Sequence, residues 1–140
     1  LPMLLKTSEE KIVSARDVAN IFRNILLAED EIDRQKEHFW VAGLSSSNQI
    51  LYIELVTLGL LDQALTHARE TYRMAIMKAA SKIMAVHNHP SGKIIPSEQD
   101  KKTCKNLSDA GKILEIKLLD FLIISENNER YWAASEEGIL

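Results

Sequence analysis

Apolar residues occur along the chain in two patterns, one typical of strands and one typical of helices. Five segments have the length and apolar character of strands: 37–44, 50–58, 83–86, 116–125 and a short last strand near Tyr131. The polar residues 45–48 predict an antiparallel hairpin between the first two, and Asn127 and Asn128 predict the turn before the last. The first ten residues show no clear period and are expected to form an ordered arm or a frayed end.

Three segments place apolar residues three and four positions apart, as one face of a helix does. They begin at Ser14, Ala68 and Ser97. We expect the first helix to end in the acidic run 28–33, a solvated surface or linker, the second near Ser81 and the third at Gly111. The expected buried face of the second helix consists of Tyr72, Ala75, Ile76, Ala79 and Ala80, with Met74 and Met77 filling gaps in the core.

The order of these elements is helix, two strands, helix, strand, helix and two strands. This order predicts an α/β fold, in which helices pack against a mixed sheet of parallel and antiparallel strands. With 140 residues, the chain is long enough to bury a core as a single compact domain.

The composition narrows the classes of partner. A net charge of −3 gives no general attraction to phosphate backbones, so DNA binding is not supported, although a local basic patch stays open. Cys104 is the only cysteine, which excludes an internal disulfide and fits a reducing compartment such as the cytoplasm. No apolar run has the length of a membrane span, so no membrane association is expected.

Residues 85–100 concentrate the side chains that carry chemistry. His87 and His89 are two positions apart in an expected strand, so their imidazoles point to the same side and converge. Pro90 and Gly92 end the strand, which places both histidines at its carboxyl end, facing a loop.

Ser97 and Asp100 follow at the start of the next helix. Their spacing is that of a capping box, and taken alone it predicts a helix cap only. A carboxylate in the first helical turn can also be brought back toward the histidines. Two imidazoles and one carboxylate, with a fourth position open to water, form the ligand set of a catalytic zinc site, although iron, manganese and nickel accept the same ligands.

This motif resembles that of a known family. The chain contains His-x-His-Pro and, with seven residues between the second histidine and the serine, Ser-x-x-Asp. This pattern resembles the metal motif of JAMM (JAB/MPN) metalloproteases. The string HNHPSG, followed by PS, D, AG and LLD, resembles the bacterial RadC-like branch over residues 37–135. The resemblance implies a JAB/MPN-like (cytidine-deaminase-like) domain at 37–140, preceded by an N-terminal arm and helix at 1–36.

The resemblance also implies a function: zinc-dependent hydrolysis of a peptide or isopeptide bond in an unknown protein substrate. In that reading His87, His89 and Asp100 bind Zn²⁺, and the Ser97 hydroxyl stabilises the oxyanion. Glu37 is the favoured general base, because the family places its catalytic glutamate at the beginning of the hairpin. Glu54, inside the second strand, stays the alternative.

Other aromatic and histidine side chains are expected to be structural. His38 points away from Glu37 across its strand, and His67 precedes a helix that it could cap. Trp40 and Trp132 are expected to pack in the core or at a sheet edge.

Two alternatives of other classes stay open. Some proteins of this fold lack metal ligands and act as interaction modules, and the RadC name associates the branch with DNA repair and recombination, either on DNA or on a repair partner. An exposed strand edge would allow a homo-oligomer or a bound peptide.

Overall fold

The computed structural model describes residues 3–6, 11–59 and 67–140. The strands are β1 (Met3–Lys6), β2 (His38–Leu44), β3 (Ile50–Leu58), β4 (Lys82–Asn88), β5 (Lys117–Ser125) and β6 (Asn128–Ala133). The helices are α1 (Ala15–Leu27), α2 (Glu31–Arg34), α3 (Ala68–Met77) and α4 (Glu98–Leu114). The strands form a six-stranded sheet in the order β1-β3-β2-β4-β5-β6, in which β4 and β5 are parallel and the other described pairs are antiparallel.

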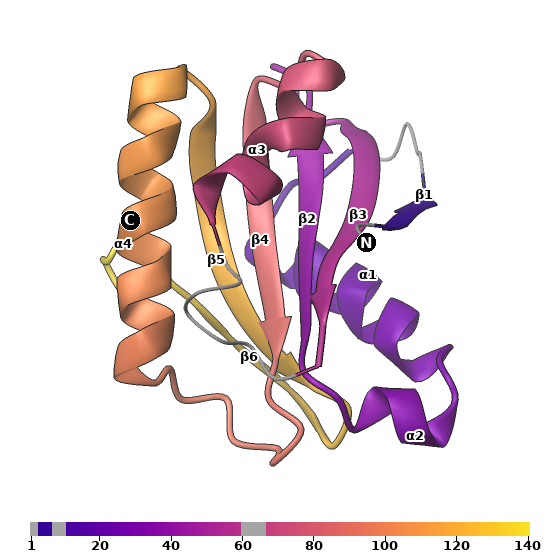
Figure 1. Cartoon of the computed structure of the whole chain (residues 1–140). Helices are drawn as coiled ribbons and strands as arrows, with labels where there is room; N and C mark the ends of the chain where they lie inside the picture. Colours follow the sequence, from indigo (N-terminus) through magenta and orange to yellow (C-terminus); the bar gives the residue numbers. More distant parts are fainter. Residues whose placement is uncertain (1–2, 7–10, 60–66) are drawn as a thin grey trace.

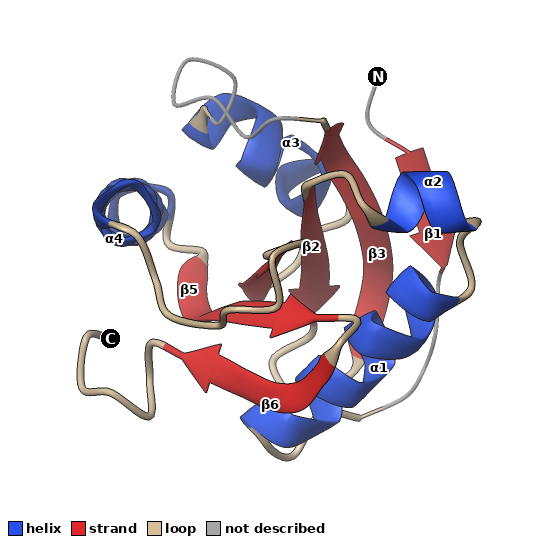
Figure 2. Ribbon diagram, turned by 90° about the horizontal axis from the view of Figure 1, so that it is seen from below, coloured by secondary structure: helices blue, strands red, loops and turns tan. Residues whose placement is uncertain are grey.

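Helices cover both faces of this sheet (Figures 1 and 2). Helix α1 packs on one face, and α3 and α4 pack on the other. Because both faces are covered, all seven residues of β2 are buried, as is usual for a central strand between two layers. The predicted mixed sheet flanked by helices is confirmed.

The site-bearing end of the molecule follows from the connections of the sheet. Helix α4 joins the parallel strands β4 and β5, so the chain leaves the carboxyl end of β4 and enters α4 after a short loop. Strand β2 runs antiparallel to β4, with Phe39 opposite His87. The beginning of β2, the end of β4 and the beginning of α4 therefore meet at one end of the central strands.

The N-terminal part of the chain also packs on the sheet. Helix α1 begins at the predicted capping box and buries Val18, Phe22 and Leu26. It ends at Leu27. The second half of the acidic run, expected as a solvated surface or linker, lies in the short helix α2, and the side chain of its N-cap, Asp30, accepts a hydrogen bond from Asp33 N–H. Part of the predicted arm is ordered, since β1 pairs with β3.

The predicted end of the second helix is wrong, and so is part of its buried face. Helix α3 ends at Met77, after which Ala79 takes a positive φ of 54°. Tyr72 and Ala75 are buried as expected, but Ile76 and Met77 are 57% and 71% exposed. The buried face of α3 is rotated toward Thr71, whose hydroxyl donates to the carbonyl of His67 in the preceding turn. Ile76 therefore lies at the margin of the buried face and Met77 lies outside it.

Gly111 does not end α4, which continues to Leu114 and closes with Glu115 in the left-handed region. Gly111 lies where α3 approaches: a Cβ there would stand 2.4 Å from the hydroxyl of Tyr72 and 2.4 Å from the carbonyl oxygen of Ile116. The Tyr72 hydroxyl donates a hydrogen bond to the carbonyl of Leu107 at 2.8 Å. The glycine therefore permits close helix packing. None of the described helices has the length and apolar character needed to cross a membrane.

Candidate metal centre

The two histidines lie at the carboxyl end of β4, as the strand pattern predicted. His87 is the penultimate residue of the strand and is 2% exposed. His89 follows the strand, and its N–H still donates to the carbonyl of Ile124 in β5 at 2.9 Å. The chain then turns, because Gly92 N–H donates to the carbonyl of His89 at 3.1 Å and Gly92 adopts a φ of +87°.

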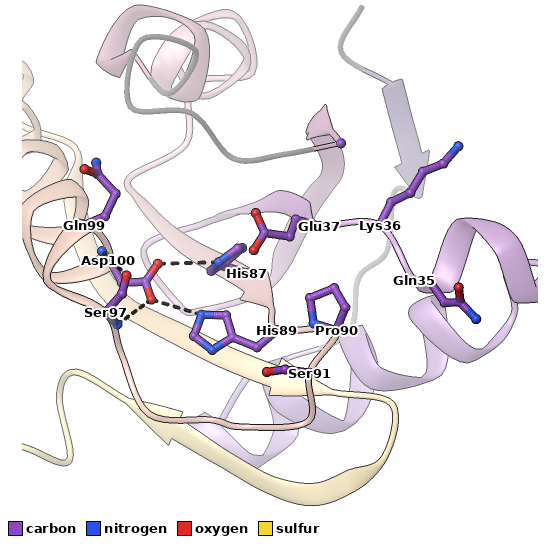
Figure 3. A pocket seen from close by; sticks show the side chains of 11 residues that line it. Gln35, Lys36, Glu37, His87, His89, Pro90, Ser91, Ser97, Gln99 and Asp100 are labelled. Atoms are coloured by element: carbon purple, nitrogen blue, oxygen red, sulfur yellow. Dashed lines mark hydrogen bonds and ion pairs between the residues drawn. The ribbon is translucent and has the colours of Figure 1, made fainter.

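Backbone carbonyls orient both imidazole rings. Nδ1 of His87 lies 3.1 Å from the carbonyl oxygen of His38, and Nδ1 of His89 lies 2.7 Å from that of Lys93. A carbonyl oxygen can only accept, so each Nδ1 carries the hydrogen. In the neutral rings both Nε2 atoms then present lone pairs, and Figure 3 shows them directed at the same carboxylate.

That carboxylate belongs to Asp100, in the first turn of α4. The predicted capping box is present: Asp100 N–H donates to Ser97 Oγ at 3.1 Å, and Ser97 N–H donates to Asp100 Oδ2 at 2.8 Å. The cap holds the carboxylate toward β4 rather than toward solvent, and Asp100 is 4% exposed. Its Oδ1 is 3.5 Å from His87 Nε2, and its Oδ2 is 3.0 Å from His89 Nε2.

The donor set fits a metal ion. Two lone-pair nitrogens that face carboxylate oxygens repel them unless a proton or a cation lies between. The three side chains each offer one ligand atom, and these atoms all lie within 4.8 Å of one another. Ligand atoms of a tetrahedral zinc ion stand about 3.3 Å apart, because zinc–nitrogen and zinc–oxygen distances are about 2.0–2.1 Å. His87, His89 and Asp100 thus form a group that could hold a metal ion.

The protonation states also suit metal binding. Burial lowers the pKa of His87, against the opposing charge of Asp100. For Asp100, burial acts to raise the pKa, but hydrogen bonds from His89 and the Ser97 backbone outweigh it and the pKa is lowered. For His89, burial is likewise outweighed by the bonds to Asp100 and to the Lys93 carbonyl, so its pKa is raised. A neutral His87 and an ionised Asp100 are the forms that bind metals, whereas a proton on Nε2 of His89 would compete with the metal for that atom.

The three side chains form part of the wall of a cavity of about 700 Å³. Other residues on its wall include Gln35, Lys36, Glu37, Ser91, Ser97 and Gln99. Continuing the register of β2 and β4 by two pairs past Phe39 and His87 places Glu37 opposite His89 and on the same face. Figure 3 shows the Glu37 carboxylate directed into this cavity, near His87.

Glu54, the alternative general base, lies elsewhere. It is opposite Val41, which is opposite Ala85 in β4, so strand geometry puts its Cα roughly 12 Å from that of His87. It is fully buried, and among the described residues neither carboxylate oxygen has a hydrogen-bond partner. Burial raises its pKa, although Arg73 opposes the shift. The structure brings Glu37, and not Glu54, to the cavity with the histidines.

The remaining candidate side chains stand apart from the cavity. His38 is fully buried on the opposite face, with Nε2 2.6 Å from Glu29 Oε2 and its ring stacked on Trp40 at 4.7 Å. His67 precedes α3 but makes no side-chain capping bond in the described part of the chain. Trp132 packs half-buried against the core under α3 and α4.

The sequence did not reveal what orients the ligands. The carbonyls of His38 and Lys93 carry no side-chain signature, because any residue supplies a backbone oxygen. The sequence analysis also missed the hydrogen bonds of Asn88 to the backbone on either side of Glu37. A signal existed, because alternation along β4 directs this polar side chain into the buried opposite face, where it needs partners.

Comparison with known proteins identifies the family. Residues 12–139 match the profile of the RadC-like JAB domain. The chain belongs to the RadC-like JAB domain family. The matched residues include α1 as well as the hairpin.

Its relatives include UPF0758 proteins of several bacteria. One from Chlorobaculum tepidum is 42% identical over 118 residues, which are 84% of this chain and 51% of the relative. One from Caldanaerobacter subterraneus is 41% identical over 126 residues, 89% of this chain and 52% of the relative. One from Listeria monocytogenes is 41% identical over 103 residues, which are 74% of this chain and 45% of the relative. This RadC-like JAB domain thus spans about half the length of the curated relatives that it matches.

Proposed function

We propose that this RadC-like JAB domain is a zinc-dependent hydrolase that cleaves a peptide or isopeptide bond. The observation that carries the proposal is the convergence of His87, His89 and Asp100, with ligand atoms within 4.8 Å of one another, on the wall of a cavity that also holds Glu37 and Ser97. Metal ligands, a candidate base and a hydrogen-bond donor around one space are the parts that hydrolysis of an amide requires.

The ion would be held by Nε2 of His87, Nε2 of His89 and the Asp100 carboxylate. Three protein ligands are the number that catalytic zinc sites use, whereas structural sites use four. When bound, zinc supplies Lewis-acid polarisation of a carbonyl oxygen and lowers the pKa of a coordinated water to about 7. The carbonyls of His38 and Lys93 keep the two rings oriented, as partners of ligating histidines do in other metal sites.

Glu37 would move the proton. Its carboxylate lies near His87 and is directed into the cavity, where it would accept a proton from the attacking water. It would then give that proton to the amine that leaves when the carbon–nitrogen bond breaks, so that one group acts as base and then as acid. A positioned acid or base of this kind contributes about 10²- to 10⁴-fold to a rate.

Ser97 would stabilise the charge that develops on the substrate. Its hydroxyl oxygen accepts the N–H of Asp100, which leaves the hydroxyl hydrogen to donate. Ser97 lies on the cavity wall beside Asp100, so this hydrogen can be given to the carbonyl oxygen as it becomes negative. The helix cap would thus serve the chemistry as well as the fold.

The size of the cavity indicates the kind of substrate. A space of about 700 Å³ accepts the side chains around one bond of an extended chain but not a folded domain. We therefore propose that the substrate protein presents a flexible or terminal segment to the cavity at this end of the central strands.

The test is an unbiased cleavage assay. Chelator-treated protein is reloaded with zinc and incubated with a mixture of natural peptides and isopeptide-linked conjugates, and new termini are identified by mass spectrometry. We expect cleavage that requires zinc and is lost in Glu37→Gln, which keeps all three ligands. Zinc-loaded protein that cleaves nothing, or Glu37→Gln that cleaves as fast as the wild type, would contradict the proposal.

A further inference from the structure

Asn88 lies between the two histidines on β4 and has no part in the mechanism described so far. Because side chains alternate along a strand, it points to the face opposite the cavity. It is 1% exposed, and a buried side-chain amide needs partners for both its oxygen and its nitrogen. Its partners show what it holds.

Both partners belong to the backbone around Glu37. Oδ1 of Asn88 accepts a hydrogen bond from His38 N–H at 2.5 Å, and Nδ2 donates one to the carbonyl of Lys36 at 3.0 Å. The Lys36 carbonyl is part of the peptide group that precedes the Glu37 Cα, and the His38 N–H is part of the one that follows it. A single side chain thus binds both peptide planes that flank Glu37.

Holding two successive peptide planes sets the φ and ψ of the residue between them, because each plane is rigid. The direction of the Glu37 Cβ, and with it the placement of the carboxylate in the cavity, follows from these two angles. The carbonyl of Glu37 also accepts a hydrogen bond at 2.9 Å from Gly59 N–H, just after the end of β3. This bond is a third constraint on the backbone of Glu37. The base is therefore tied to the strand that carries the two candidate ligands.

We infer that Asn88 is a positioning residue, which couples the end of β4 to the backbone of Glu37 and so holds the base at a set offset from His87 and His89. This inference rests on the proposed function, since it takes Glu37 as the base. The role needs an acceptor and a donor on one short side chain. An ionised aspartate supplies only acceptors, and serine is too short to reach both peptides.

The first test separates positioning from metal binding. In zinc-loaded protein, with a peptide found in the cleavage assay, we expect Asn88→Asp to lower kcat by about 10- to 100-fold while KM and zinc affinity change by less than about 3-fold. The matched control is Asn128→Asp, at the start of β6, where the side-chain oxygen accepts a hydrogen bond from Arg130 N–H. This control should leave every parameter unchanged. Loss of zinc affinity as large as that of His89→Ala, or an unchanged kcat, would overturn the inference.

A double-mutant cycle tests whether Asn88 acts through Glu37. If it does, Asn88→Asp should change the residual rate of Glu37→Gln by less than about 3-fold, because the group that it positions is already disabled. A full 10- to 100-fold loss in that background would show that Asn88 acts by another route and would overturn the inference.

A third measurement does not depend on activity, so that a failed cleavage assay leaves the inference testable. Amide exchange at His38 N–H should be more than about 10-fold faster in Asn88→Ser, which is too short to keep both bonds, than in the wild type. In crystals of the zinc-bound variants the Glu37 carboxylate should be displaced from its wild-type position. Should Asn88→Asp fail to fold, Asn88→Ser, which buries no charge, serves for all three tests. Unchanged exchange and an unmoved Glu37 would overturn the inference even if zinc-dependent cleavage is found.

Discussion

Helices α1 and α4 begin with the same local structure but in different surroundings. In α1, Asp17 N–H donates to Ser14 Oγ at 3.3 Å and Ser14 N–H donates to Asp17 Oδ2 at 3.0 Å. In α4, Ser97 and Asp100 repeat this arrangement at 3.1 and 2.8 Å. Both pairs are capping boxes with the sequence Ser-x-x-Asp.

The two carboxylates differ in their contacts outside the capping box. Asp17 accepts one more backbone hydrogen bond, from Val13 N–H at 2.9 Å at the surface. Asp100 is buried and faces Nε2 of both His87 and His89. The motif determines where a helix starts, whereas the opposing strand determines whether its acid can bind a metal. The two boxes therefore serve as matched controls for each other.

The largest expected effect is the loss of metal binding in Asp100→Asn compared with Asp17→Asn. Both changes keep an oxygen that can accept the cap hydrogen bond, but only the first removes a candidate ligand charge. We expect Asp100→Asn to weaken zinc binding by more than about 100-fold, since partners of ligands alone contribute about 10- to 100-fold. Asp17→Asn should leave zinc affinity unchanged. Isothermal titration of both variants measures this, and equal affinities would refute the contrast.

A smaller difference is expected between Ser97→Ala and Ser14→Ala. Each loses a cap and about 0.5–2 kcal/mol of unfolding free energy. Only Ser97→Ala should also lower kcat, by about 10²- to 10³-fold, because it removes the proposed oxyanion donor. Denaturation gives the first quantity and zinc-saturated kinetics the second. Equal kcat values for the two variants would restrict Ser97 to its structural role.

Zinc binding should also raise the unfolding free energy, and the same two aspartate variants test this. At a free concentration 100 times its Kd, zinc adds about 2.7 kcal/mol to the unfolding free energy of a protein whose folded state alone binds it. We expect this increase in the wild type and in Asp17→Asn, and not in Asp100→Asn. Thermal melts with zinc and with chelator measure it. Stabilisation of Asp100→Asn by the same amount would place the ion elsewhere.

The smallest expected effect concerns Glu54, a buried carboxylate without the partners that Asp100 has. Burial raises its folded pKa above the ordinary value of 4.5, so the folded state retains a proton that the unfolded state loses as pH rises. Below pH 4.5 both states are protonated and Glu54→Gln should match the wild type. As pH rises above 4.5 the wild type loses stability that Glu54→Gln keeps, so the variant should melt at a higher temperature at pH 8. Melts at pH 4 and pH 8 test the sign.

The sequence predicted what depends on local pattern and failed where distant parts of the chain meet. The five predicted strands, the starts of α1, α3 and α4 and the grouping of His87, His89 and Asp100 follow from alternation and from turn and cap residues. The continuation of α4 through Gly111 does not, because it depends on the approach of Tyr72 from another helix. The partners of Asn88, at the start of β2 and just before it, likewise depend on how β2 and β4 pair. The catalytic roles of Glu37 and Ser97 stay predictions.

The most direct test of the metal centre is anomalous diffraction at the zinc absorption edge from crystals grown with zinc. We expect one strong peak within bonding distance of His87 Nε2, His89 Nε2 and the Asp100 carboxylate, absent from Asp100→Asn crystals grown in the same way. No peak between these three side chains in the wild type, or an undiminished peak there in the variant, would contradict it.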